Sequence, residues 1–65
     1  MREALFLALY KLFLFRGNAL VSDVDRHCAS DLDALDEARA LSRDHAVEVY
    51  TEARLIGRVS KASRP

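Results

Sequence analysis

The feature that most constrains the fold is an apolar run that ends in a tight-turn signal. The run from Tyr10 to Phe15 is followed by Arg16-Gly17-Asn18, and a second β-like segment, ALVSDVDRHC, extends from Ala19 to Cys28. Glycine and asparagine both tolerate the positive φ that two-residue hairpin loops require. The sequence therefore predicts a β-hairpin whose first strand begins at about Tyr10. The preceding segment, Ala4 to Leu9, favours an opening turn or two of helix.

A two-residue loop at Gly17-Asn18 also predicts a register for this hairpin. Residues that face one another in an antiparallel pair lie on the same face of the sheet. The predicted pairs on one face are Phe15–Leu20, Phe13–Ser22 and Lys11–Val24, and those on the other are Leu14–Val21, Leu12–Asp23 and Tyr10–Asp25. The first strand is thus apolar on both faces, whereas the second is half polar.

The stretch Ser30-Asp31-Leu32-Asp33 predicts the start of a helix. Ser30 is a favourable N-cap, and Asp33 lies at the position from which a side chain can return the hydrogen bond. Apolar residues recur at intervals of three through the next three turns, which predicts one apolar stripe on a helix from about Asp31 to Ser42. The stripe consists of Leu32, Leu35, Ala38 and Leu41, with Ala34 beside them.

After this helix, the segments AVEVY and LIGRV flank TEAR and predict a second hairpin with a loop of three or four residues. The predicted fold is α+β, a single small ββαββ domain with one helix packed on one face of an antiparallel sheet. The domain covers residues 10–59, with an N-terminal extension at 1–9 and a flexible tail at 60–65.

Composition limits the classes of function. The chain has 65 residues, one cysteine and a formal net charge of +0. A single cysteine excludes a disulfide within the chain and favours a cytoplasmic location. A neutral chain is not expected to bind nucleic acid, because such binding requires the neutralisation of phosphates. A domain of this size buries only about 60% of its surface on folding, so self-association is an expected source of stability.

The N-terminal run ALFLALYKLFLF is too short to span a bilayer, for which about 20 residues are needed. It also contains Lys11 and lacks the cleavage site of a signal peptide. An association with a membrane is therefore not expected. Docking on a membrane surface stays open as an alternative, through this run and the basic residues near the C-terminus, which are Arg54, Arg58, Lys61 and Arg64.

The order of motifs resembles that of a group of short bacterial proteins, mainly alphaproteobacterial, which have no established activity. The matching pieces are YKLFLFRGNALV, CASDLDAL, EARAL, AVEVY and RLIGRV, between Tyr10 and Val59. The chain departs from the group's pattern in two ways: Tyr50 stands where the group has tryptophan, and Thr51-Glu52 replaces its Asp-Gly turn. The resemblance implies the ββαββ layout and assigns no chemistry.

No combination of residues predicts a catalyst, so no enzymatic activity and no cofactor are expected. Asp23, Asp25 and His27 alternate along one strand and are weak candidates for a metal site, because carboxylates and imidazoles bind zinc or manganese. A solvated strand face explains the same alternation. Cys28 follows His27, but neighbours in a strand point to opposite faces, so we expect a buried thiol just before the helix.

The remaining candidate for a functional site is the face of the sheet that the helix does not cover. One helix covers only one face of a four-stranded sheet, so the apolar residues on the other face need a partner. We expect a protein-interaction domain, with a homodimer as the favoured form and cover by residues 1–9 as the alternative. The expected contact residues are Leu12, Phe13, Leu14, Phe15 and Tyr50, since aromatic side chains often anchor interfaces.

Overall fold

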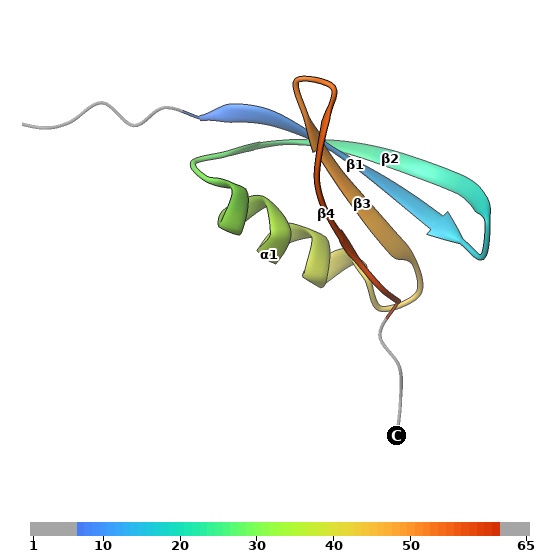
Figure 1. Cartoon of the computed structure of the whole chain (residues 1–65). Helices are drawn as coiled ribbons and strands as arrows, with labels where there is room; N and C mark the ends of the chain where they lie inside the picture. Colours follow the sequence, from blue (N-terminus) through green and yellow to red (C-terminus); the bar gives the residue numbers. More distant parts are fainter. Residues whose placement is uncertain (1–6, 62–65) are drawn as a thin grey trace, which may run out of the picture.

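A computed structural model describes residues 7–61, which form two β-hairpins joined by one helix (Figure 1). The strands are β1 (Ala8–Arg16), β2 (Ala19–Cys28), β3 (Ala46–Thr51) and β4 (Arg54–Val59), and the helix is α1 (Asp31–Leu41). The strands form one antiparallel sheet in the order β2-β1-β3-β4. The predicted ββαββ fold is confirmed.

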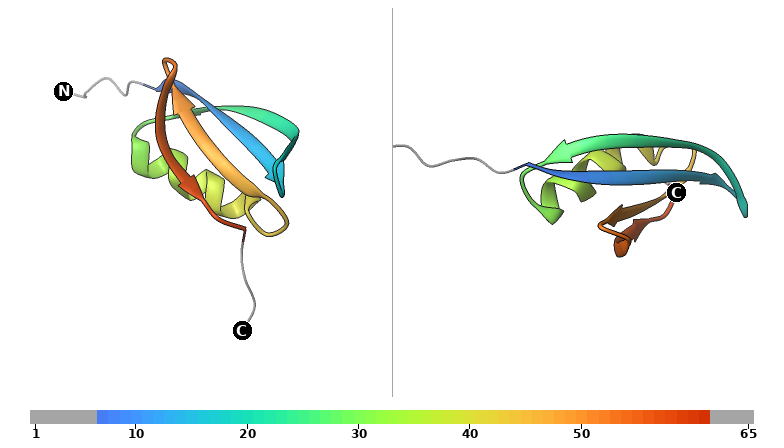
Figure 2. Two further views of the ribbon diagram at one scale, coloured as in Figure 1. Left: turned by 45° about the vertical axis from the view of Figure 1, so that its right-hand side comes forward. Right: turned by 90° about the horizontal axis from the view of Figure 1, so that it is seen from above.

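The helix lies along one face of this sheet, and two further views show that no described helix or strand covers the opposite face (Figure 2). The helix connects β2 to β3, which lie on either side of β1. The strand that is apolar on both faces therefore occupies a central position, where both of its edges are hydrogen-bonded.

The N-terminal strand begins at Ala8, two residues before the expected start. The helical turn expected from Ala4 to Leu9 is therefore wrong at Ala8 and Leu9, which are extended, and its first part, Ala4 to Phe6, lies outside the described residues. Ser60 and Lys61 have no regular secondary structure, and the rest of the expected tail is likewise outside this range.

The first hairpin has the predicted two-residue loop, with a positive φ of 62° at Gly17. The predicted register is correct at Phe15–Leu20 but wrong beyond it, because an irregularity between Leu14 and Phe15 makes Val21 an extra residue on β2. A bulge of this kind shifts every later pair by one residue. Lys11 consequently lies opposite Asp25 and not Val24.

The second hairpin also has a two-residue loop, so the predicted loop of three or four residues is wrong. Thr51 pairs with Arg54, which leaves only Glu52 and Ala53 in the turn. Both adopt a positive φ, 52° and 63°, without the glycine or asparagine that such turns usually contain. This backbone is strained by roughly 1–2 kcal/mol per residue.

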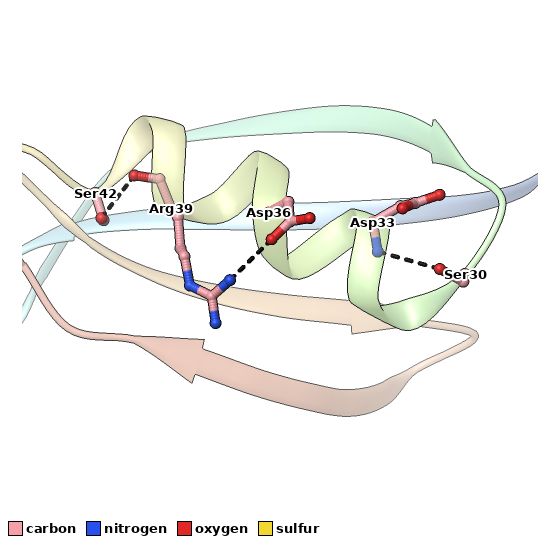
Figure 3. Close-up of polar contacts among 5 residues, drawn as sticks. All are labelled: Ser30, Asp33, Asp36, Arg39 and Ser42. Atoms are coloured by element: carbon pink, nitrogen blue, oxygen red, sulfur yellow. Dashed lines mark hydrogen bonds and ion pairs between the residues drawn. The ribbon is translucent and has the colours of Figure 1, made fainter.

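The helix begins as predicted. The Ser30 hydroxyl accepts a hydrogen bond from the Asp33 amide at 3.2 Å, and Asp36 pairs with Arg39 on the exposed side (Figure 3). Ser42 closes the last turn by donating from its hydroxyl to the Arg39 carbonyl. The predicted stripe is wrong at Leu32, which is 72% exposed. The side of the helix that packs on the sheet is centred on Ala34 and Ala38, and Leu32 lies outside it.

The core lies between the helix and the sheet. Leu12, Val47 and Val49 are fully buried against the two helical alanines. Small residues let the helix approach closely, and at Gly57 an added Cβ would lie 3.1 Å from a methyl group of Leu35.

Two polar contacts fix the N-terminal end of β1 to its neighbours. The Tyr10 hydroxyl donates to Asp31 at 2.7 Å, and the Thr51 hydroxyl donates to the Leu9 carbonyl at 2.9 Å. The first contact ties β1 to the start of α1, and the second ties it to the end of β3.

Candidate functional site

The candidate site is the face of the sheet opposite α1, which we call the open face. Its side chains follow from the register, and they form two complete rows across β2, β1, β3 and β4. The first row is Asp25, Lys11, Tyr50 and Leu55, and the second row is Asp23, Phe13, Glu48 and Arg58. Leu9 and His27 pair beyond the first row, and Phe15 lies between Leu20 and Ala46 beyond the second.

Two aromatic rings occupy the centre of the open face. Phe13 and Tyr50 pack edge to face, with ring centroids 5.4 Å apart and planes inclined by 80°. The Tyr50 hydroxyl donates to Glu48 Oε1 at 3.1 Å, and this hydrogen bond raises the pKa of Tyr50. Aromatic pairs of this geometry contribute about 0.5–1.5 kcal/mol beyond the area that they bury.

Charged side chains flank the aromatic pair on both sides. Lys11 Nζ lies 3.0 Å from Asp25 Oδ1 and 3.7 Å from Asp23 Oδ2, and the hydrogen bond to Asp25 is the main cause of the raised pKa of Lys11. Arg58 Nε lies 3.9 Å from Glu48 Oε2 on the other side. These pairs are largely solvated, so they order the face more than they stabilise the fold.

A pocket of about 350 Å³ lies on the open face beside the strained turn of the second hairpin. Leu9, Phe13 and Tyr50 form its apolar part, and Glu52 and Ala53 form the wall at the turn. A second hollow of about 370 Å³ lies toward the other end of the sheet, near Phe15 and Arg58. Both volumes are within the range of small-molecule pockets, but both hollows are open to solvent.

The five expected contact residues divide between the two faces of the sheet. Leu12 is fully buried and Leu14 is 8% exposed, and both lie beneath α1. Phe13, Phe15 and Tyr50 lie on the open face and are half-buried. Only these three of the five are therefore at a surface that another molecule can reach without displacing the helix.

The candidate metal ligands Asp23, Asp25 and His27 lie on one side of β2, as their alternation predicts. The ammonium group of Lys11 lies within ion-pair distance of both carboxylates, 3.0 Å from Asp25 and 3.7 Å from Asp23, where a metal ion would have to bind. Within residues 7–61, no group of histidine, cysteine and acidic side chains is arranged to hold a metal ion.

Cys28 is buried just before the helix, as predicted. Its side chain lies on the covered side of the sheet, whereas His27 lies on the open face. Burial, together with the negative charges of Glu37 and Asp33, raises the pKa of the thiol. The thiol is therefore protonated at neutral pH, and the neighbouring imidazole of His27 is not placed to activate it.

Three large apolar side chains at the surface were not among the sequence-based candidates. Leu9, Leu20 and Leu55 are each about half exposed and lie on or beside the open face. The alternation of Leu55, Gly57 and Val59 indicates that these residues share one face of a strand. The irregularity between Val49 and Tyr50 instead places Leu55 on the open face and Val59 on the covered face.

Among residues 7–61, no helix is long and apolar enough to cross a membrane. No protein-family model matches the chain, and no curated protein or solved structure is found to match it. The strand-strand-helix-strand-strand layout that the resemblance implied is present in the fold, but a bacterial origin stays a prediction.

Proposed function

We propose that this chain is a non-enzymatic protein-interaction domain that self-associates through the open face. The observation that carries the proposal is the edge-to-face pair of Phe13 and Tyr50 at the centre of a face that α1 does not cover. Half-buried aromatic rings surrounded by polar side chains are typical of the anchors of protein interfaces.

The size of the domain supports the same proposal. A 65-residue chain has a small core, and among residues 7–61 the largest fully buried side chains are those of Leu12, Val47 and Val49. Burial of the open face against a partner would add apolar contacts that one copy cannot make by itself. A second copy of the chain supplies such a partner without any other protein.

The chemistry of the described side chains gives no support to a catalytic role. The thiol of Cys28 is buried and His27 points away from it, while the open-face acids Asp23 and Asp25 are held by Lys11. The proposal accordingly includes no substrate and no cofactor, and it places the protein in the cytoplasm, where a free thiol is stable.

Sedimentation equilibrium on the untagged chain, from low micromolar to millimolar concentration, tests the proposal. We expect the wild-type chain to dimerise and the Phe13→Glu variant to be monomeric, because the substitution places a charge at the centre of the interface. Leu55→Glu is a second disruptive variant at a more exposed position of the same face.

Leu32→Glu is the matched control, because Leu32 is exposed on the helix and lies away from the open face in the fold. This variant is expected to dimerise like the wild-type chain. Circular dichroism establishes that each variant is folded. A folded Phe13→Glu variant that still dimerises, or a wild-type chain that is monomeric at millimolar concentration, would contradict the proposal.

A further inference from the structure

The charges of the open face are arranged asymmetrically across the sheet, and this arrangement constrains how two copies can meet. In the row through Phe13, an acid (Asp23) lies on the β2 edge and a base (Arg58) lies on the β4 edge. In the row through Lys11, the cation lies on β1 and the aromatic ring of Tyr50 lies on β3. When the first of these rows meets a copy of itself in reverse order, Asp23 faces Arg58. When the second row does so, Lys11 faces Tyr50.

We propose that the partner of the open face is a second copy of this chain, packed face to face about a twofold axis parallel to β1. The inference rests on the proposed function and specifies its geometry. Rotation about this axis reverses the order of the strands and keeps each row at its own level. Asp23 then lies opposite Arg58 of the second copy, and Lys11 lies opposite the ring of Tyr50 of the second copy.

The alternative twofold axis in the same plane is perpendicular to the strands. It keeps the strand order, so β2 of one copy faces β2 of the other. The carboxylates of Asp23 and Asp25 would then meet the carboxylates of the second copy, and such like-charge contacts are unfavourable. The axis parallel to β1 avoids these like-charge contacts, although it also places Phe13 opposite Glu48 and Asp25 opposite Leu55 of the second copy.

Asp23 and Arg58 retain the capacity to make these contacts. The ammonium of Lys11 lies closer to Asp25 (3.0 Å) than to Asp23 (3.7 Å), and Arg58 is 3.9 Å from its own acid, Glu48. The side chains of Asp23 and Arg58 are 52% and 55% exposed. Lys11 is also placed for a cation–π contact with the Tyr50 ring of the second copy.

The size of the open face sets the expected strength of the dimer. A sheet of four strands about 4.8 Å apart, with a mean strand length of about 25 Å, presents roughly 500 Å². Two such faces bury roughly 1,000 Å² in total, which is at the lower limit for specific interfaces. We therefore expect a dissociation constant in the micromolar range, raised by salt because charged contacts contribute to it.

Two charge reversals test the axis by complementation. In a homodimer, Asp23→Arg places two guanidinium groups opposite each other at both symmetric contacts, and Arg58→Asp places two carboxylates opposite each other there. Each variant alone is expected to raise the dissociation constant about tenfold or more. In an equimolar mixture both contacts of the heterodimer join opposite charges, so dimerisation is expected to return to the wild-type level in sedimentation equilibrium.

The two variants differ in net charge from the wild-type chain by +2 and −2, so a matched control must exclude general electrostatic attraction. Asp36→Arg and Arg43→Asp make the same changes at exposed positions outside the open face. Each control variant is expected to dimerise like the wild-type chain, and mixing the two is expected to bring no gain.

The outcomes separate this inference from the proposed function. If the wild-type chain dimerises and Phe13→Glu is monomeric, but the mixture of charge-reversed variants does not recover, the axis is overturned and the proposed function stands. If the wild-type chain is monomeric throughout, both the axis and the proposed function fail. Recovery in the mixture, with none in the control mixture, supports the axis.

Discussion

The two faces of the sheet are built from the same strands but differ in chemistry. The covered face carries aliphatic side chains such as Leu12, Val47 and Val49, which are completely buried beneath α1. The open face carries three aromatic rings, of which Phe13 and Tyr50 lie between ion pairs, and its central residues are half-buried. Adjacent residues of β1, Leu12 and Phe13, therefore have different surroundings although both are large and apolar.

This difference shows what a single helix can and cannot do for a small sheet. The helix removes one face from water, where dispersion contacts and apolar burial stabilise the fold. On the other face, charged neighbours such as Lys11 and Arg58 keep a partly apolar surface hydrated while leaving its aromatic centre accessible. The first face explains stability, and the second is the candidate for function.

The largest expected effect comes from truncation of one residue on each face of the same strand. Leu12→Ala should lower the free energy of unfolding by about 2–5 kcal/mol, because it leaves a cavity in the core. For a chain of this length that loss approaches the total stability, which is roughly 3–10 kcal/mol. Phe13→Ala should cost less, because its ring is already partly exposed. Urea unfolding followed by circular dichroism measures both.

Protein concentration sharpens this comparison. The loss caused by Phe13→Ala should shrink on dilution, since part of it is lost association, whereas the loss caused by Leu12→Ala should not change. An equal loss for both variants at low concentration would mean that the two faces contribute alike to the monomer, contrary to the comparison.

An intermediate effect is expected at the two hairpin turns. Ala53 adopts a φ of 63°, so Ala53→Gly should raise the free energy of unfolding by about 1 kcal/mol. Gly17→Ala should lower it by about 1 kcal/mol, because φ is 62° there and no described atom lies within 4 Å of an added Cβ, which leaves backbone strain as the cause. Thermal unfolding measures both changes.

The turn at Ala53 also forms a wall of the pocket on the open face, whereas the turn at Gly17 does not line that pocket. A change in the dissociation constant of the dimer with Ala53→Gly, at unchanged fold, would show that the strained turn shapes the interface. No gain in stability would contradict the assignment of strain to this backbone.

The last predicted effect is a loss of stability that concerns the two tyrosines. It is absent at neutral pH and occurs only at alkaline pH. The hydrogen bond from Tyr10 to Asp31, with burial, raises the pKa of Tyr10 from 10.0 to about 12, and the bond to Glu48 raises the pKa of Tyr50. The unfolded chain loses its phenolic protons near pH 10, so ionisation favours unfolding above that pH. The contribution of Tyr10 to the free energy of unfolding is therefore constant below about pH 10 and is lost between about pH 10 and 12.

Absorbance at the tyrosinate band can follow this titration, because the chain has two tyrosines and no tryptophan. Tyr10→Phe should remove most of the alkaline loss of stability, whereas Tyr50→Phe should remove less and leave the covered face intact. If Tyr10 titrated in the folded chain at the same pH as a free phenol, the Tyr10–Asp31 contact would be contradicted.

Local signals predicted most of the elements. Gly17-Asn18 predicted the first hairpin because its loop needs a positive φ, and Ser30 predicted the start of α1 because its hydroxyl can cap a free amide. The range of β2 and the existence of the second hairpin followed in the same way. These features depend on a few neighbouring residues, which a sequence displays directly.

The candidate site was predicted less well, for two physical reasons. A bulge at Val21 and the irregularity at Tyr50 depend on how two strands settle against each other, and each one moves side chains to the opposite face. The pairing of Lys11 with Asp25 and the exposure of Leu55 could not be predicted without them. The resemblance to short bacterial proteins implied the layout but not the register.

By itself, the sequence determined the order of the elements, the first turn, the helix start and the presence of one strand that is apolar on both sides. Only the tertiary structure decided which side became core. Leu12 and Phe13 are equivalent in hydrophobic pattern, and the difference between them arose when Ala34 and Ala38 let the helix approach Leu12, Val47 and Val49 closely. That close packing buried one side of β1 and left the other available to a partner.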